Sequence, residues 1–560
     1  MKKIFTVSIL LVLWCYGCSK KQNTGLVTNK AMVVSARIEA SQIGSDIMKK
    51  GGNAFDAMVA TELSLAVAYP FAGNLGGGGF MVYRLENGVA GSLDFREKAP
   101  MAATKNMYVD SLGNVIPNLS TLGAKAIGVP GTIAGLLEAH EKYGKLPLRE
   151  VIQPVINLAV KGVVVTKKQA NTLKNYKDII VQTSGDSTYF AKEIKEGDTL
   201  KYPKLAATLK IIQQQGKDGF YKGKVAKSLV NLIQKHGGLI TKEDLAAYQA
   251  KWRKPITFNY KNLHIISMAP PSSGGITLEE IMKMIAPYPI EKYGHNSTKT
   301  IQVITEAERR AYADRNYFLG DPDFVHIPTD TLTNDEYLKK RMHNFSFEKA
   351  TPSTAVSHGN IQIVESNETT HFSIVDQYGN AISVTTTLNG AYGCKLYSDD
   401  LGFFLNNEMD DFSSKPGVPN MFGLTGAEAN SIAPQKRMLS SMTPTIVEKD
   451  GKLAMVVGTP GGSTIITSVL QTILNVYDFN MGMQQAVDAA RFHHQWLPDE
   501  VMFEPNGFSK NTLDTLKSKG YYINENNSPI IGKVDAILRL DNQKLEAGAD
   551  KRGDDAAAGF

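Results

Sequence analysis

The chain has few cysteines, and their arrangement excludes a structural zinc site. Among 560 residues only Cys15, Cys18 and Cys394 are cysteine, and they form no pair of CxxC motifs and no CxxC followed by spaced histidines. A structural zinc site needs several such ligands at regular spacing. Because Cys15 and Cys18 lie in an N-terminal targeting segment, its removal leaves Cys394 without a disulfide partner. We expect Cys394 to be a small buried side chain.

Long runs of one charge and the common hydrolase motifs are also missing. The 61 basic and 55 acidic residues give a net charge of +6, and no run of five like charges occurs. Such a mixed surface gives no indication of a nucleic-acid groove, and we expect no nucleic-acid partner. None of the ten histidines has HExxH spacing, and the stretch 270–275 is not a GxSxG motif. A zinc protease or a Ser-His-Asp hydrolase therefore has little support.

The composition indicates a globular protein with a sizeable core, since 42% of the residues are hydrophobic and 21% are charged. At roughly 150 residues per domain the length suggests three or four domains, although layered α/β enzymes often run longer as one unit. Helical patterns are expected around 54–68, 131–142, 149–161, 204–214, 225–236 and 299–313. Strand-like runs are expected at 79–84, 90–95, 262–268, 371–376, 381–388, 444–448 and 453–457. This alternation in blocks predicts a layered α/β protein.

The N-terminus has the pattern of a secretory signal. Two lysines precede an apolar-rich run over residues 4–14, which is shorter than the about 20 residues that a membrane-spanning helix needs. The segment resembles a bacterial lipoprotein signal with Gly17 before a lipidated Cys18, although Cys15 and Tyr16 stand where small or aliphatic residues are usual. Plain cleavage and release is the alternative. In both cases we expect an exported protein, periplasmic or held at a membrane by a lipid anchor alone.

The segment 54–68 is predicted to be a buried helix followed by a glycine-rich loop. Asn53 can cap this helix, and Asp56 adds a carboxylate to its first turn. The loop 74–80 contains four consecutive glycines and precedes a strand. A phosphate-binding loop needs a helix after its glycines, so we expect close backbone packing in this loop instead.

A β-hairpin is predicted around the turn Gly379-Asn380. In its second strand Thr385, Thr387 and Asn389 share one face, because side chains alternate along a strand. The middle of three possible registers places Thr369 directly opposite Asn389. An exposed polar face is the alternative to a function for these side chains.

Several long motifs follow one another along the chain and carry a resemblance to a known family. They are NLGGGGF at 74–80, LDFRE at 93–97, PPSSGG at 270–275, AYADR at 311–315, TTH at 369–371, NNEMDD at 406–411, LSSM at 439–442 and GTPGGS at 458–463. In this order they resemble the γ-glutamyltransferases, which are N-terminal nucleophile hydrolases, from about Ala31 to the C-terminus. The resemblance implies an αββα sandwich and an enzyme without metal, nucleotide or organic cofactor.

The resemblance also implies a precursor that cuts itself between Glu368 and Thr369. A signal segment (1–18) and a tether (19–30) would precede a large subunit (31–368) and a small catalytic subunit (369–560). The two subunits would form a heterodimer folded as one intertwined domain. The freed α-amine of Thr369 would then activate its own hydroxyl as the nucleophile. The adjacent Thr370 is the alternative nucleophile. Thr387 matches a threonine that hydrogen-bonds the nucleophile and supports processing.

Recognition of the γ-glutamyl group is implied residue by residue. Arg96 resembles the arginine that binds the α-carboxylate, assisted by the hydroxyls of Ser440 and Ser441. Glu408 and Asp411 resemble the acids that hold the α-ammonium with the help of Asn389, and Gly461 and Gly462 match the oxyanion hole. The alternatives are a structural ion pair of Arg96 with Asp94 or Glu97, a capping role for Asp411, and tight turns at the two glycines. Asp410 is expected to be structural.

The long segment 413–430 resembles the lid of bacterial members, in which a tyrosine closes over the site. Phe422 stands at that position here, so it can cover the cavity but cannot donate a hydroxyl hydrogen bond to Asn389. The sequence therefore predicts a less tightly latched lid.

The function that the resemblance implies is transfer of γ-glutamyl groups from glutathione and other γ-glutamyl donors to water, amino acids or peptides. A glutaryl-amide acylase of the same fold is the alternative, but a glutaryl group has no ammonium for Glu408 and Asp411 to bind. A lipoprotein that keeps the fold for binding without catalysis is a second alternative.

Overall fold

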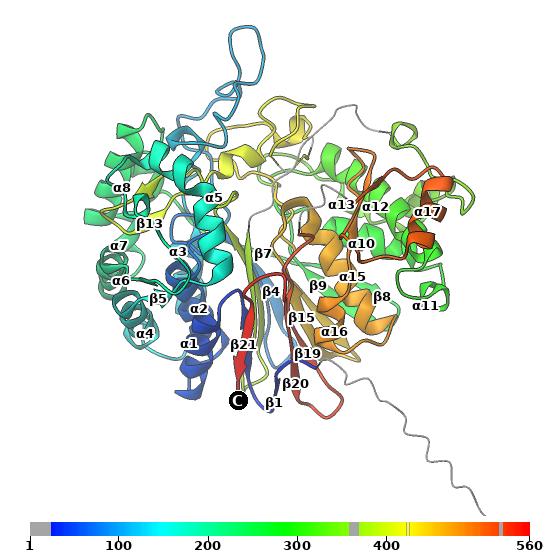
Figure 1. The fold of residues 1–560 in the computed structure, drawn as a ribbon, viewed down its shortest axis with the longest axis horizontal. Coiled ribbons are helices and arrows are strands. Elements are labelled where there is room, and N and C mark those ends of the chain that lie inside the picture. The colour runs from blue at the N-terminus through cyan, green and yellow to red at the C-terminus, as the bar shows by residue number, and fades with distance from the viewer. Residues whose placement is uncertain (1–23, 358–368, 422, 425, 526–529) are drawn as a thin grey trace, which may run out of the picture.

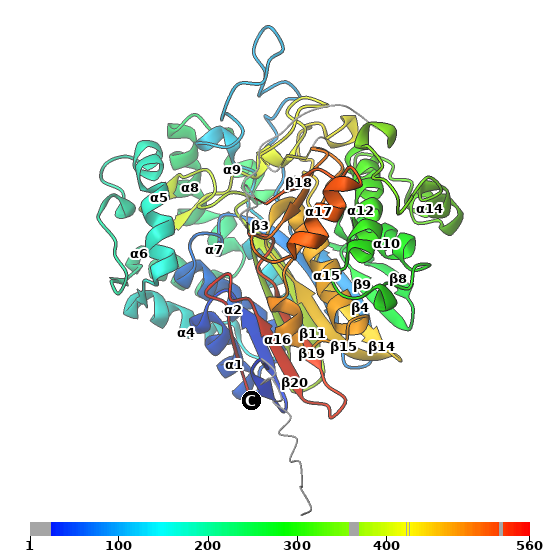
Figure 2. The same cartoon turned by 45° about the vertical axis from the view of Figure 1, so that its right-hand side comes forward.

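The computed structural model describes residues 24–357, 369–421, 423–424, 426–525 and 530–560. In this part of the chain, two seven-stranded antiparallel sheets pack face to face, and a layer of helices covers the outer face of each (Figures 1 and 2). The αββα sandwich that the resemblance implies is confirmed. The signal, Cys18, Glu368 and Phe422 lie outside the described residues.

Sheet I consists, in spatial order, of β21 (Ala556–Gly559), β2 (Met32–Ser35), β10 (Thr370–Val375), β11 (Ala381–Thr387), β3 (Gly78–Arg84), β4 (Ala90–Asp94) and β7 (Lys251–Arg253). Sheet II consists of β1 (Val27–Thr28), β20 (Leu545–Ala549), β19 (Asp535–Arg539), β15 (Lys452–Gly458), β14 (Thr445–Lys449), β9 (Leu263–Ser267) and β8 (Ile256–Tyr260). Strands from before and after the predicted cleavage site therefore lie side by side in both sheets.

The helices on sheet I are α1 (Ile38–Lys49), α2 (Ala54–Ala68), α3 (Thr132–Tyr143), α4 (Leu148–Lys161), α5 (Lys167–Ser184), α6 (Pro203–Gln215), α7 (Asp218–Tyr221), α8 (Gly223–Lys235) and α9 (Lys242–Ala246). Those on the side of sheet II are α10 (Gly274–Ile285), α11 (Ile290–Tyr293), α12 (Thr298–Phe318), α13 (Thr329–Leu332), α14 (Asp335–Arg341), α15 (Ile465–Tyr477), α16 (Met483–Asp488) and α17 (Lys510–Ser518). Short ladders join β5 (Val163–Val164) to β6 (Thr199–Leu200), β12 (Tyr397–Ser398) to β13 (Phe403–Phe404), and β16 (Phe492–His493) to β17 (Val501–Phe503) and β18 (Ile523–Asn524).

Both faces of the central strands are buried. In β2, Val33 packs in the cluster under the helices of sheet I, while Met32 and Val34 pack in the cluster between the two sheets. Sheet II contributes Ile446 and Val456 to that inner cluster. Because β2 is covered on both sides, its sequence is mostly apolar instead of alternating, whereas the buried polar side chains of β10 and β11 form hydrogen bonds inside the molecule.

Helix α2 confirms the prediction for 54–68. Asn53 accepts hydrogen bonds from the N–H groups of Phe55 and Asp56, and the Asp56 carboxylate accepts from the Asn53 N–H, which completes a capping box. Every residue of the helix is buried. The glycine loop before β3 also packs as expected, since a side chain at Gly77 or Gly79 would collide with carbonyl oxygens of β11.

The register predicted for the hairpin was wrong. Thr370 pairs with Thr386 and Val375 with Ala381, which brings Thr369 opposite Thr387 and not Asn389. The turn is longer than the dipeptide Gly379-Asn380, because the carboxylate of Asp376 accepts hydrogen bonds from the N–H groups of both Tyr378 and Asn380. Gly379 has a φ of 93° in this turn, a conformation that favours glycine.

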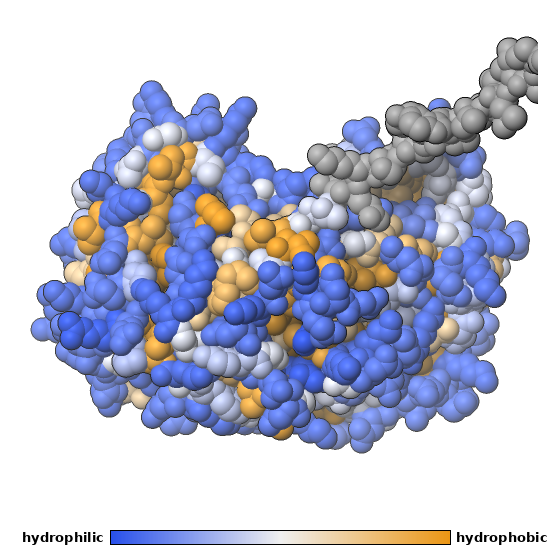
Figure 3. Space-filling view, turned by 90° about the horizontal axis from the view of Figure 1, so that it is seen from below, coloured by the Kyte–Doolittle hydropathy of each residue, from blue (hydrophilic) through white to orange (hydrophobic). Residues whose placement is uncertain are grey.

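The face of the molecule seen from below is mostly hydrophilic, with small apolar patches scattered over it (Figure 3). In the described ranges no helix combines the length and the hydropathy that crossing a bilayer requires.

Candidate active site

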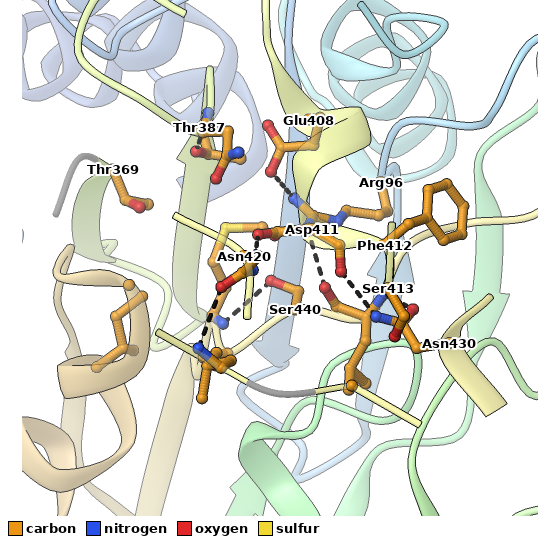
Figure 4. A pocket seen from close by; sticks show the side chains of 18 of the residues that line it. Arg96, Thr369, Thr387, Glu408, Asp411, Phe412, Ser413, Asn420, Asn430 and Ser440 are labelled. Carbon is orange, nitrogen blue, oxygen red and sulfur yellow. Dashed lines mark hydrogen bonds and ion pairs between the residues drawn. The ribbon is translucent and has the colours of Figure 1, made fainter. Parts of the chain in front are cut away.

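A cavity lies where β10 begins and β11 ends (Figure 4). The predicted residues that line it are Arg96, Thr369, Thr387, Asn389, Glu408, Asp411, Ser440, Ser441 and Gly462. Gly461 does not line the cavity but directly precedes Gly462. The structure therefore brings together, from distant parts of the chain, nearly the whole predicted set.

Thr369 is positioned by the sheet. It precedes β10, is 4% exposed and lines the cavity, whereas Thr370 does not. Since side chains alternate along a strand, the Thr370 hydroxyl lies on the opposite face, where it is buried without a hydrogen-bond partner in the described part of the chain. The geometry therefore favours Thr369 over Thr370 as the nucleophile.

Thr387 makes a different hydrogen bond from the predicted one. Its hydroxyl accepts from the N–H of Asn389 at 2.7 Å, and no hydrogen bond joins it to Thr369 among the described residues. The amide of Asn74, in the glycine loop, donates to the Thr387 carbonyl at 3.1 Å. The loop therefore fixes the end of β11, and the role of Thr387 in processing stays a prediction.

His371, two residues beyond Thr369, is a structural side chain. Its ring nitrogens lie 2.9 Å from the Thr385 hydroxyl and 3.1 Å from the Ser373 hydroxyl, between the two sheets. Burial lowers the pKa of His371 to about 3. The ring is neutral at neutral pH and does not line the cavity, so the base must be another group.

Arg96 is completely buried and is held by three acids. Its guanidinium pairs with Glu408 and Asp411, both of which point toward it in Figure 4, and lies 3.6 Å from Glu97. The carboxylate of Asp94 instead pairs with Arg253 and Arg437. Thr369 and Arg96 lie on opposite sides of the cavity.

Too many carboxylates meet at Arg96 for all of them to ionise easily. Burial raises the pKa of Glu97 to about 7, although the Arg96 cation opposes the change. Burial also raises the pKa of Glu408 and of Asp411, and both acids repel each other while Arg96 lowers their pKa in part. An added ammonium group would relieve this repulsion.

The backbone around Ser440 and Ser441, the two serines of the LSSM motif, is held by hydrogen bonds from the PPSSGG motif. The N–H and hydroxyl of Ser273 both donate to the Ser440 carbonyl, at 2.7 and 2.8 Å, and the Ser272 hydroxyl donates to the Met442 carbonyl at 2.6 Å. This anchoring leaves the Ser440 and Ser441 hydroxyls at the cavity wall.

Gly461 and Gly462 form the turn that leads into α15. Their φ values of 142° and 54° belong to the region that favours glycine. N–H groups at the start of a helix lack partners inside it and favour negative charge. Gly462 lines the cavity, so its N–H is suited to a developing oxyanion.

The described residues of the segment 413–430 contribute Ser413, Asn420, Leu424, Gly426 and Asn430 to the cavity wall, and they make contacts that the sequence did not predict. The amide of Asn420 donates to the Asp411 carboxylate at 3.1 Å, and the amide of Asn430 donates to the Asp411 carbonyl at 2.7 Å. Asp410 accepts from the Ser120 hydroxyl at 2.6 Å and from the Met421 N–H at 2.8 Å, in keeping with a structural role. The effect of Phe422 stays a prediction.

Arg315 is a further lining residue that the sequence reasoning missed, although its motif, AYADR, was noted. Its position in α12 gave no signal, because only the tertiary fold brings that helix to the cavity. Cys394 is buried as predicted, and burial raises the pKa of its thiol to about 12. In the described ranges no group of three or more His, Cys, Asp or Glu side chains could hold a metal ion.

An αββα sandwich of two antiparallel sheets, with a threonine directly before a central strand at the cavity, is the arrangement typical of the N-terminal nucleophile hydrolases. A solved cephalosporin acylase from Bacillus halodurans shares this fold with a TM-score of 0.84 at 24% identity, over 99% of both chains. The crystal structure of Helicobacter pylori gamma-glutamyltranspeptidase is 42% identical with a TM-score of 0.57, over 62% of this chain and 98% of that one.

The family model described as Gamma-glutamyltranspeptidase matches residues 40–560. The Glutathione hydrolase proenzyme of Escherichia coli (strain K12) is 45% identical over 550 residues, which cover 97% of this chain and 94% of that protein. The chain belongs to the gamma-glutamyltranspeptidase family. It is an enzyme of γ-glutamyl hydrolysis and transfer, as the sequence predicted.

Proposed function

We propose that Thr369 carries this activity after the chain cuts itself between Glu368 and Thr369, and that glutathione and related γ-glutamyl amides are the donors. The observation that supports the proposal is the cavity itself, which has a strand-end threonine on one side and a cation between two acids on the other. A γ-glutamyl group has the matching ends, a reactive carbonyl and a zwitterionic α-carbon.

Self-cleavage would begin with attack of the Thr369 hydroxyl on the carbonyl carbon of Glu368. The peptide C–N bond breaks as the acyl group moves to the hydroxyl oxygen, and the nitrogen takes the proton to become the free α-amine of Thr369. Water then hydrolyses the ester, which leaves a carboxylate on Glu368. Such an amine has a pKa of about 7.7–8.0, so an appreciable fraction is an unprotonated base at neutral pH.

In each turnover this amine would take the proton of the Thr369 hydroxyl, whose oxygen attacks the γ-carbonyl of the donor. The N–H groups of Gly461 and Gly462 would stabilise the resulting oxyanion, and each such donor contributes about 3–4 kcal/mol to lowering the barrier. The leaving amine takes the proton, and the acyl-enzyme remains. Water or the amine of an amino acid or peptide then releases the γ-glutamyl group.

Binding of the donor would exchange one set of ion pairs for another. The α-carboxylate would bind Arg96 and the hydroxyls of Ser440 and Ser441, while the α-ammonium would bind Glu408, Asp411 and Asn389. Because the ligand brings both charges, each group that loses its partner in the Arg96 cluster gains a new one. A glutaryl amide lacks the ammonium, so Glu408 and Asp411 would gain no new partner from it.

Export belongs to the same proposal. The pattern over residues 1–18 supports a signal that is removed, with lipidation at Cys18 as the means of attachment to a membrane. Anchored or released, the enzyme would meet γ-glutamyl donors outside the cytoplasm.

The first experiment is the intact mass of the purified chain made without residues 1–18. Two species that meet at Glu368 and Thr369 are expected, and a Thr369→Ala variant should stay uncut. The mature enzyme should then hydrolyse a γ-glutamyl anilide faster than a glutaryl anilide. A single uncut species would contradict the proposal, and a preference for the glutaryl anilide would favour the acylase alternative.

A further inference from the structure

Arg315 differs from the other buried arginines of α12 in its ion pairs. It lies in the last turn of the helix, is 3% exposed and lines the cavity. Arg310 pairs with Glu306 at 2.6 Å, and Arg309 pairs with Asp499. Within the described ranges no carboxylate forms a salt bridge with Arg315. A buried charge without a direct ion pair is costly, and Asp411 offsets only part of this cost from a distance, which points to a ligand that supplies a carboxylate.

All the hydrogen-bond partners of Arg315 are neutral. Nη2 donates to the Ser441 hydroxyl oxygen at 3.0 Å, Nε donates to the Ser273 hydroxyl at 3.2 Å, and Nη1 donates to the Asn316 side-chain oxygen at 3.0 Å. Burial lowers the pKa of Arg315 to about 10, with partial compensation from Tyr312 and Asp411, so the guanidinium keeps its charge at neutral pH.

The contact with Ser441 fixes the direction of that hydroxyl. A hydroxyl has one hydrogen to donate, and an oxygen that accepts from a cation must direct this hydrogen elsewhere. In the described part of the chain the Ser441 hydroxyl has no acceptor, and the residue lines the cavity. Ser441 is therefore held as a donor toward whatever fills the cavity.

Arg96 alone is poorly placed to attract a carboxylate. Glu408 and Asp411 already pair with its guanidinium, and its N–H groups also donate to the carbonyls of Met438 and Leu439, both at 3.3 Å. Counted as charges, Arg96 is outnumbered by these two acids. Arg315 adds a second positive charge beside these acids, and a zwitterionic ligand adds no net charge to the cavity.

We propose that Arg315 is a positioning residue for donor recognition: it holds Ser441 as a hydrogen-bond donor and supplies a positive charge, in no direct ion pair with a described carboxylate, near the donor's α-carboxylate. The inference rests on the function proposed for this cavity. It restricts the donors to γ-glutamyl compounds with a free α-carboxylate, and it assigns Arg315 no contact with the reacting atoms.

The test compares two anilide donors on the processed enzyme: γ-glutamyl-4-nitroanilide and 4-aminobutanoyl-4-nitroanilide, which lacks only the α-carboxylate. For Arg315→Met we expect KM for the γ-glutamyl donor to rise at least tenfold, with kcat changed less than threefold. The preference for the γ-glutamyl donor should fall by the same factor, and Arg315→Lys should restore part of it. Arg309→Met, which removes a buried arginine of the same helix away from the cavity, should leave the preference unchanged.

A loss of rate that is equal for both donors would overturn the inference, because it would mean that Arg315 only supports the fold. If Arg315→Met fails to fold or to process, Ser441→Ala and Arg315→Gln provide the second test. Both should lose the preference, and the double variant should lose little more than either alone, since both substitutions remove the same interaction. If the double variant instead lost the sum of the two single effects, Arg315 and Ser441 would act independently, and the inference would be overturned. A parent enzyme that shows no preference for the γ-glutamyl donor would instead contradict the proposed function.

Discussion

The sulfur of Met421 lies 3.5 Å from the amide nitrogen of Asn389 and 3.6 Å from that of Asn407. The backbone N–H of Met421 is in turn held by the Asp410 carboxylate at 2.8 Å. A thioether is a weak acceptor, so the side chain of Met421 is held to Asn389 without a strong hydrogen bond. The residue that contacts Asn389 is thus Met421, the neighbour of the predicted lid residue Phe422.

Replacing Met421 by Leu should therefore weaken donor binding modestly. Leucine keeps the apolar volume but cannot accept from the Asn389 amide, so we expect KM for a γ-glutamyl anilide to rise two- to fivefold with little change in kcat. Steady-state kinetics of the processed enzyme measure this effect. Identical KM values for the parent and the variant would show that the sulfur contact does not hold the segment.

The two adjacent threonines should respond in opposite ways to loss of the hydroxyl. Thr369→Ala should abolish cleavage, because no nucleophile remains on the cavity face. Thr370→Val, which keeps the shape and removes a buried hydroxyl without a partner among the described residues, should cleave normally and be no less stable. The intact mass of each variant after incubation measures how much of the chain has been cleaved. Cleavage in the Thr369 variant with loss in the Thr370 variant would reverse the assignment.

Asp411 and Asp410 form a matched pair of neighbours for a test of ammonium recognition. Asp411 lines the cavity and Asp410 does not. Asp411→Asn should lower the ratio of kcat/KM for γ-glutamyl over glutaryl anilide by about 10- to 100-fold, since a hydrogen bond to a charged group contributes about 1.5–3 kcal/mol. Asp410→Asn should leave this ratio within a factor of three. Equal effects of the two substitutions would exclude a specific role for Asp411.

Glu62 on α2 should make stability depend on pH. Its carboxylate accepts from the Thr386 hydroxyl at 3.0 Å and from the Asn74 N–H at 3.3 Å, but burial raises its pKa from 4.5 to about 7. Between these values the folded state holds a proton that the unfolded state has released, so the contribution of Glu62 to stability falls as pH rises.

Glu62→Gln removes this titration. Its free energy of unfolding relative to the parent should therefore increase with pH from 4.5 to 7, by up to about 3 kcal/mol, and stay constant at higher pH. Urea denaturation at a series of pH values, in an uncut Thr369→Ala background, measures the difference. Parallel curves for the two proteins at pH 5 and pH 8 would exclude an elevated pKa at Glu62.

The elements that the sequence predicted best are those whose signals are local. The boundaries of α2 follow from an apolar run, the Asn53 cap and the stop before Pro70, all of which lie within a few residues. The hairpin register was missed because the Asp376 side chain reshapes the turn, and a shift of two residues preserves the alternation on which the prediction was based.

The predicted site set came from motifs, and motifs name only part of what the fold assembles. Arg315 lies in α12, one of the helices that cover sheet II, and Met421 lies in the segment 413–430. Arg315 and Met421 are both positioned by contacts with residues more than 30 positions away in the sequence, Ser441 and Asn389 respectively. Neither the hydrophobic periodicity nor the motif spacing of a sequence predicts such tertiary contacts.

The interleaving of strands in sheet I has a consequence for the life of the enzyme after the proposed cut. β2 lies between β10 and β21, so a strand of the first chain is hydrogen-bonded on both edges to strands of the second. The two chains cannot part without breaking the sheet. Before the cut the pieces meet at a concentration set by their covalent link, but afterwards an unfolded enzyme must find its partner by diffusion. The precursor therefore folds in a unimolecular reaction, whereas the cleaved enzyme can refold only in a bimolecular one.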